Sequence, residues 1–359
     1  MDNLDNNKNN NNRWSYFKKA DVRDFIFVMY VISLSVVIEF FAFEFLIEII
    51  YKFMYNFVVL YTKILQSDFV YSYPPEEINY IFTNIIIIIT SVIATFITGA
   101  FLIFWLRKID GKSRNYDRDK ISWKIKLPKN TVALIAVGLC LVQICIYLFS
   151  VFSVVLKDWF GIAENPLYGD DSYFPKSFIG IILYFITIVI IPAFTEEFIF
   201  RYLMLNSLKK YGNTFAIIVT AVLFGFAHAR ASAFLYATAI GFFTAYLAIK
   251  TKSIWFSIIL HAAVNAVSFT LQYTASLSFF KDDTLDLIYF IFLTVISAIS
   301  CIYLIILSIK RKETGLEESG NYINIRRKHK LIYFFNAATV IFFILVLMKS
   351  AEEYVFLHI

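Results

Sequence analysis

Residues 80–106 read YIFTNIIIIITSVIATFITGAFLIFWL, a run without a single charged side chain. An α-helix needs about 20 apolar residues to cross the hydrocarbon core of a bilayer, because it rises about 1.5 Å per residue. A backbone in lipid must also satisfy its hydrogen bonds internally, which a helix does within one segment. The run is long enough, so this stretch predicts a membrane-spanning helix.

Similar apolar runs recur along the chain of 359 residues, of which 59% are hydrophobic and 17% charged. We expect an all-α fold, a polytopic transmembrane helix bundle with eight or nine spanning helices, surrounded by membrane lipids. The expected crossings cover approximately residues 25–50, 80–106, 131–156, 178–208, 214–229, 231–249, 254–272, 285–309 and 331–348. Residues 1–23 form an Asn-rich tail with too little apolar surface to pack, which predicts disorder.

The charged loops indicate an orientation. Basic residues occur in the N-terminal tail and in residues 107–129, 209–210, 250–252 and 310–330, whereas the alternate loops are acidic. Because Lys and Arg accumulate in cytoplasmic loops, nine crossings from a cytoplasmic N-terminus would place every basic loop inside. The net charge of +6 is thus explained by topology, and we expect no nucleic-acid partner.

Six polar side chains interrupt the apolar runs between residues 178 and 272. They are Glu196, Glu197, Arg201, His228, His261 and Asn265. An ionisable residue at membrane depth is costly, so it usually faces the bundle interior or a wet cavity and has a partner. By contrast, we expect the glutamates at positions 39, 44 and 48 to lie near the headgroups, at the end of the first span.

Helix geometry predicts that these side chains meet. Measured from the nearest basic turn, Glu196, His228 and Asn265 each lie about 20 Å along a helix and His261 about 14 Å. Glu197 and Arg201 are spaced i and i+4, so they can form an ion pair. That pairing would leave Glu196 free to face a cavity, about 100° around the helix.

Three ordered motifs carry a family resemblance. They are Glu196-Glu197 followed by Arg201, Phe224 four residues before His228, and His261 four residues before Asn265. Over about residues 178–270 the chain resembles the CAAX prenyl protease and bacteriocin-processing family, also called the Abi family of intramembrane proteases. Residues 24–177 and 273–359 would add transmembrane helices on either side of a protease-like core at 178–272.

The resemblance implies hydrolysis of a peptide bond within the membrane. In the mechanism that we favour, Glu196 and His228 hold and deprotonate a water molecule, without any cofactor. His261 and Asn265 would donate hydrogen bonds to the oxyanion, while Glu197 and Arg201 position the helix. Zinc is an alternative, because Glu196, His228 and His261 could supply its three protein ligands.

The substrate would be a peptide or lipidated protein of CAAX, pheromone or bacteriocin-precursor type, or the activity would serve bacteriocin self-immunity. A peptide exporter or sensor is a possible partner. The frequent Ile, Lys and Asn residues point to a bacterial plasma membrane. A catalytically silent scaffold or transporter-like protein that keeps the same buried polar network is the alternative function.

Overall fold

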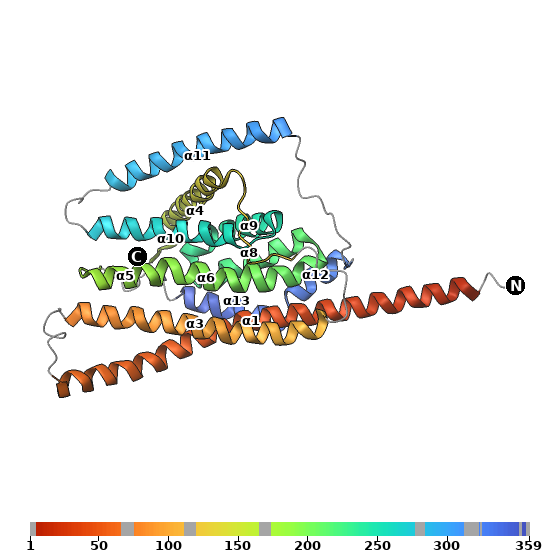
Figure 1. Cartoon of the computed structure of the whole chain (residues 1–359), viewed down its shortest axis with the longest axis horizontal. Coiled ribbons are helices and arrows are strands. Elements are labelled where there is room, and N and C mark those ends of the chain that lie inside the picture. The colour runs from red at the N-terminus through yellow and green to blue at the C-terminus, as the bar shows by residue number, and fades with distance from the viewer. Residues whose placement is uncertain are drawn as a thin grey trace.

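The computed structural model describes residues 5–65, 75–110, 120–164, 174–276, 284–311, 323, 325–351 and 354–356. The expected all-α class is confirmed, since helices form nearly all of the described chain (Figure 1). Two three-residue strands, β1 (Ile162–Glu164) and β2 (Tyr354–Phe356), pair antiparallel and tie the C-terminal segment to the end of the third long helix.

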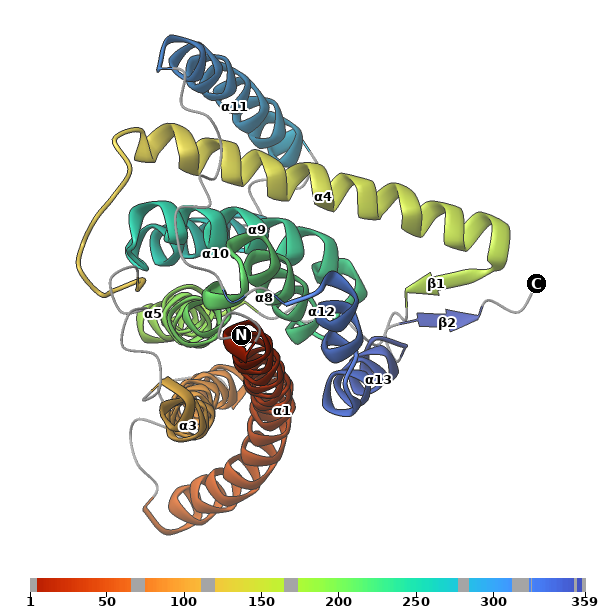
Figure 2. The same ribbon diagram turned by 90° about the vertical axis from the view of Figure 1, so that its right-hand side faces the viewer.

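Two long N-terminal helices, α1 (Asp5–Leu65) and α3 (Pro75–Asp110), run side by side. We expected disorder over residues 1–23, yet α1 begins at Asp5. The physical reason is that adding turns to an existing helix avoids the cost of a new nucleus. Helix α4 (Thr131–Phe160) runs across the others, since it is seen nearly end-on in Figure 1 and along its length in Figure 2.

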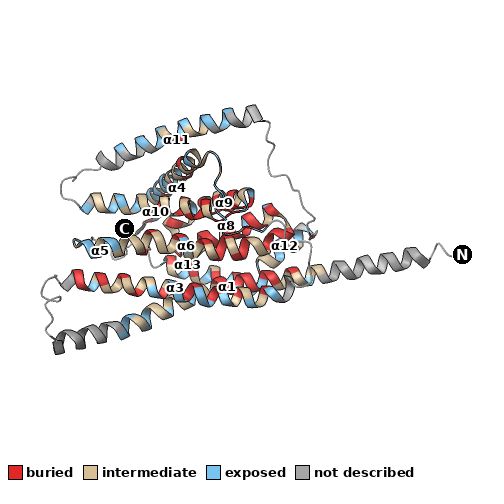
Figure 3. Ribbon diagram, in the orientation of Figure 1, coloured by how far each residue is buried: buried red, intermediate tan, exposed pale blue. Residues whose placement is uncertain are grey.

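The fourth apolar run forms one long helix with changes of pitch. Its parts are α5 (Phe178–Phe185), the π-helical η2 (Ile186–Ile190), α6 (Ile191–Glu197), the π-helical η3 (Phe198–Leu205), α7 (Asn206–Leu208) and the 3₁₀ turn η4 (Lys209–Tyr211). After it come α8 (Asn213–Ala227), α9 (Ala231–Thr251), α10 (Trp255–Ser276), α11 (Thr284–Arg311), α12 (Arg327–Phe334) and α13 (Ala337–Ala351). Figure 3 shows that buried side chains concentrate on the central helices, whereas the described face of α11 is largely exposed.

The expected count of eight or nine crossings is too high for the described residues. Six helices are long and apolar enough to span a membrane, and the bent pair of α12 and α13 would make seven. Helix α8 has 15 residues, which is shorter than the hydrocarbon core requires. Within the 28 residues of α11, the continuously described part, Thr294–Tyr303, is apolar but too short by itself to count as a span.

Helices α8 and α9 form a closely packed hairpin. A Cβ on Gly225 of α8 would overlap the Thr238 hydroxyl, and one on Gly241 of α9 would lie 3.0 Å from the Cα of Ala221. Small residues at these positions let the two backbones approach, as in other membrane helix pairs. The hairpin begins just after Lys210 and ends beside Lys252, so both of its ends lie next to basic turns. Helix α8 therefore need not cross the whole bilayer before the chain turns back along α9.

The basic segments gather at one end of the described structure. The backbone N–H of Ser122 donates to the carbonyl of Lys252 at 3.1 Å, and that of Ile323 donates to Lys210 at 2.9 Å. The ring of Phe25, near the start of the first span, lies 4.9 Å from the ring of Tyr211. This grouping agrees with loops that share one side of the membrane, while a cytoplasmic N-terminus stays a prediction.

Candidate active site

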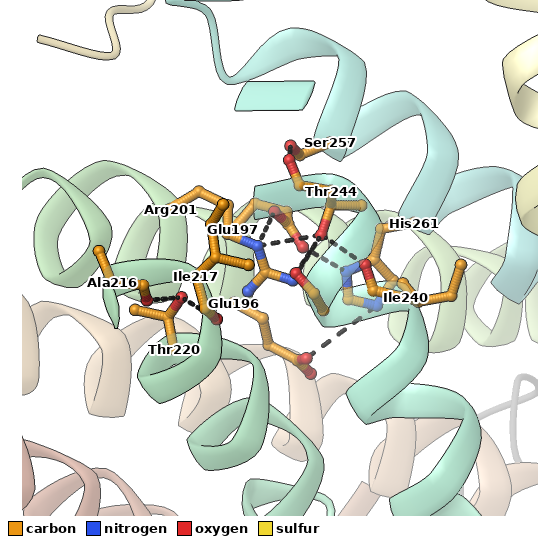
Figure 4. Close-up of polar contacts among 11 residues, drawn as sticks. Glu196, Glu197, Arg201, Ala216, Ile217, Thr220, Ile240, Thr244, Ser257 and His261 are labelled. Atoms are coloured by element: carbon orange, nitrogen blue, oxygen red, sulfur yellow. Dashed lines mark hydrogen bonds and ion pairs between the residues drawn. The ribbon is translucent and has the colours of Figure 1, made fainter. Parts of the chain in front are cut away.

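The centre of the site is a buried ion pair between Glu197 and Arg201, which confirms the expected pairing. The Nε of Arg201 lies 3.1 Å from Oε2 of Glu197, and both side chains are fully buried (Figure 4). Arg201 also donates to the Thr244 hydroxyl from Nε at 3.1 Å and from Nη2 at 2.8 Å. Its guanidinium carbon lies 4.3 Å from the ring centroid of Phe224, a cation–π contact that compensates Nη1, which has no hydrogen-bond partner.

The second oxygen of Glu197 binds a histidine from another helix. Nδ1 of His261, on α10, lies 3.2 Å from Oε1 of Glu197. A carboxylate can only accept, so Nδ1 carries the proton of this bond. One glutamate thereby fixes both the guanidinium of its own helix and the imidazole of the neighbouring helix.

Glu196 points away from this pair and is partly exposed. Its side chain keeps 34% of its accessible surface, and its Oε2 lies 4.0 Å from Nε2 of His261. Together with His228 it lines a cavity of about 370 Å³. Figure 4 shows Glu196 and Glu197 diverging from adjacent positions, with His261 between their carboxylates. A partly exposed carboxylate thus faces the cavity beside a buried one that is paired with Arg201 and His261.

His228 lies just after α8, at the turn of the hairpin. Its Nδ1 is 2.9 Å from the carbonyl oxygen of Phe224, which can only accept, so Nδ1 carries a proton. In the neutral imidazole this leaves Nε2 as an acceptor. The next residue, Ala229, has a φ of 50°, a conformation that costs a residue with a Cβ about 1–2 kcal/mol. Its carbonyl accepts from the hydroxyl of Ser350 on α13 at 3.1 Å.

The long fourth helix changes pitch on both sides of the glutamates. The π-helical η2 precedes Pro192, and the π-helical η3 begins directly after Glu197. Proline has no N–H to donate to the preceding turn, so it favours such a change of hydrogen-bond pattern. π-Helical segments rotate the side chains that follow them and often occur at functional sites.

Asn265 lies one turn beyond His261 on α10 and is partly exposed. It makes no hydrogen bond to the site's Glu, His or Arg side chains, all of which lie in the described part of the chain. The zinc expectation also finds no three-ligand set: within the described residues, no three His, Cys, Asp or Glu side chains lie close enough to hold a metal ion. Zinc binding by Glu196, His228 and His261 stays a prediction.

Two residues of this region were not expected from the sequence. Thr244 is the hydrogen-bond acceptor for Arg201, and threonines are too common in apolar helices for one to stand out. Glu39 of α1 lines the cavity together with Glu44, instead of lying at the headgroups with the exposed Glu48. The cost of a carboxylate within an apolar span was the signal that could have identified Glu39.

The fold and site together define a polytopic membrane protein with a buried Glu–Arg–His centre beside a cavity. Residues 178–267 match the model of the family described as "Type II CAAX prenyl endopeptidase Rce1-like". A stretch of 84 residues is 36% identical to "Putative membrane peptidase YdiL" of Bacillus subtilis (strain 168). That stretch is 23% of this chain and spans about a third of the relative's length, 34%. No solved structure shows a significant match.

The family match falls on the helices that carry the Glu–Arg–His centre. Over residues 178–267, about a quarter of its length, the chain is similar to the Rce1-like CAAX prenyl endopeptidase family.

Proposed function

We propose that this protein is an intramembrane endopeptidase in which Glu196 activates the attacking water. The observation that carries the proposal is that the two adjacent glutamates have different surroundings. Glu197 is fully buried and bound to Arg201 and His261, whereas Glu196 is partly exposed and lines the cavity with His228. A general base must reach a water molecule, and Glu196 is the glutamate of this pair that can.

In the proposed reaction, a water molecule lies between Glu196 and Nε2 of His228. Glu196 takes one proton from the water as its oxygen forms a bond to the carbonyl carbon of the peptide. The carbonyl oxygen becomes an oxyanion, to which Asn265 and the Nε2–H of a His261 ring protonated at both nitrogens donate hydrogen bonds. The C–N bond then breaks, and Glu196 returns the proton to the leaving amine. Every step uses side chains of this chain alone.

The cavity lies among membrane-spanning helices, so its substrate should enter from the bilayer. We propose a peptide or lipidated protein of the CAAX, pheromone or bacteriocin-precursor class, or a peptide whose cleavage confers immunity to a bacteriocin. A peptide exporter or sensor would be the matching partner. The lining is mostly apolar, with a few hydroxyl and charged groups, which suits such substrates.

The test is cleavage of quenched fluorescent peptides by the purified full chain in liposomes. One peptide carries a farnesylated C-terminal CAAX sequence, and a second is an unmodified transmembrane peptide. We expect Glu196→Gln to lower the cleavage rate by a factor of about 100 or more, as for loss of a general base. The matched control is Glu48→Gln, an exposed membrane glutamate paired with Lys52.

Two outcomes contradict the proposal. Full activity in Glu196→Gln would remove this residue from the mechanism. A wild-type chain that cleaves neither these peptides nor a library of membrane peptides would favour the silent scaffold, in which the buried Glu197–Arg201–His261 network serves only to join helices.

A further inference from the structure

Glu39 is a carboxylate in the cavity that the proposed reaction does not use. It projects from α1, outside residues 178–267 that match the family. It lines the same cavity as Glu196 and His228. Phe25 and Tyr211 are in ring contact, and Glu39 lies about 21 Å along α1 from Phe25, while Glu196 lies about 22 Å along its own helix from Tyr211. The two carboxyl groups therefore lie at similar depth, and both line this cavity.

The side-chain donors recorded beside the carboxyl group of Glu39 are neutral threonine hydroxyls. Its Oε1 accepts one long bond from Thr95 on α3, at 3.4 Å, and its Oε2 is buried without any partner. The fully buried Thr98 hydroxyl is a second neutral group beside this carboxyl group. A buried polar atom without a partner is costly, so this oxygen is available for a donor that comes from outside the chain.

The charges around the cavity indicate which kind of hydrogen-bond donor would bind Glu39. Among the described residues that line it, Lys349 is the one Lys or Arg, and it is already paired with Glu44. The lysine of the cavity wall is thus paired with Glu44, and neither Glu39 nor Glu196 has an ion pair with a Lys or Arg of this wall among the described residues. A cation within a membrane usually needs a carboxylate partner, and an apolar cavity with excess negative charge supplies one.

We propose that Glu39 binds a basic side chain of the substrate, lysine or arginine, close to the bond that is cleaved. The inference rests on the proposed function, because it takes the cavity as the place where a peptide binds. It names the substrate class more narrowly: a membrane peptide with one basic residue inside its apolar segment. Glu39 then determines specificity, while Glu196 acts on the water.

The test measures binding, so that it does not depend on hydrolysis. The full-length Glu196→Gln chain in liposomes is titrated with dye-labelled transmembrane peptides of one sequence that differ at one residue. That residue is Lys, norleucine or Glu, and it is moved through the central positions in turn. We expect the best-placed Lys peptide to bind about tenfold or more tightly than its norleucine counterpart, as for a desolvated charge pair.

The variants separate charge recognition from loss of fold. Glu39→Gln should abolish the preference for Lys, Glu39→Asp should keep part of it, and Glu48→Gln, exposed and paired with Lys52, should keep all of it. Equal binding of Lys and norleucine peptides at every position would overturn the inference, and so would a Lys preference that survives in Glu39→Gln. If the wild type cleaves nothing but the Glu39-dependent preference is found, the proposed function fails and the binding site stands.

Discussion

Oε1 of Glu197 lies 3.2 Å from Nδ1 of His261, a residue 64 positions further along the sequence. This contact joins their two helices. The same carboxylate pairs with Arg201 through Oε2, and all three side chains are buried. Buried charges are tolerated when each has a partner, so this group behaves as a unit. The adjacent Glu196 does not belong to this group. We therefore predict that replacing Glu196 and replacing Glu197 change the stability of the fold by different amounts.

Glu197→Gln should destabilise the fold, whereas Glu196→Gln should not. The first change leaves the Arg201 guanidinium buried without its counter-charge, which typically costs about 3–5 kcal/mol. The second replaces a partly exposed side chain by an isosteric one. Thermal unfolding in a mild detergent, monitored by circular dichroism, measures the stability of both variants. Equal stability of the two variants would mean that the buried group of Glu197, Arg201 and His261 does not hold the helices together.

Thr244→Val should also destabilise the chain, because the Thr244 hydroxyl accepts two bonds from Arg201. A hydrogen bond to a charged group contributes about 1.5–3 kcal/mol. Thr220→Val is the matched control, since Thr220 is fully buried but donates only to backbone carbonyls of its own helix (Figure 4). The same unfolding assay should show a larger loss for Thr244→Val, and equal losses would contradict the network.

Sequence reasoning predicted the parts of the site that follow from helix geometry and from the cost of charge in lipid. The Glu197–Arg201 pair follows from i, i+4 spacing on one helix, and the open position of Glu196 follows from its neighbour's pairing. The partners of Arg201 and His261 across helices depend on how helices pack, which spacing along one helix does not specify. For this reason Thr244 and the Glu197–His261 bond were found only in the structure.

The same limit applies to the first helix and to the number of crossings. The apolar run at 25–50 predicted a span, but the face that α1 turns toward the cavity depends on its contact with α3. Residues 214–229 are apolar enough to suggest a crossing, yet α8 ends at Ala227 because the chain must turn to begin α9 at Ala231. Hydropathy separated the two apolar segments at this turn, but it did not show that the 15 residues of α8 are too few for a crossing.

Gly225→Ala should disturb the hairpin that positions His228. The added methyl group would overlap Thr238 and approach the carbonyl oxygen of Phe234 at 3.0 Å. Overpacking of this kind costs about 1–3 kcal/mol and should move His228 at the hairpin turn. The rate of peptide cleavage should fall even under conditions in which the variant stays folded. Thr238→Ala in the same chain should restore part of the activity, and a variant equal to the wild type would show that α8 and α9 are not in close contact.

Chelation should leave peptide cleavage unchanged in the proposed mechanism. Nδ1 of His261 is bound to Glu197, and no three-ligand set occurs within the described residues. The measurement is the cleavage rate after exhaustive treatment with a strong zinc chelator, together with elemental analysis of the purified protein. Loss of activity that zinc restores, with one zinc per chain, would replace the water-only mechanism by a metal-dependent one.

Ser350→Ala should lower activity, although α13 lies outside the segment that matches the family. The Ser350 hydroxyl donates to the carbonyl of Ala229, and this bond supports a residue whose backbone is strained beside His228. Loss of this bond should lower the free energy of unfolding by about 1 kcal/mol, as for a typical hydrogen bond. The cleavage rate should fall clearly even where the chain stays folded, because general-base geometry tolerates little displacement. Ser150→Ala is the control, since the exposed Ser150 hydroxyl donates only to Ile146 of its own helix. Equal cleavage by the two variants would mean that the C-terminal helix does not position the hairpin turn.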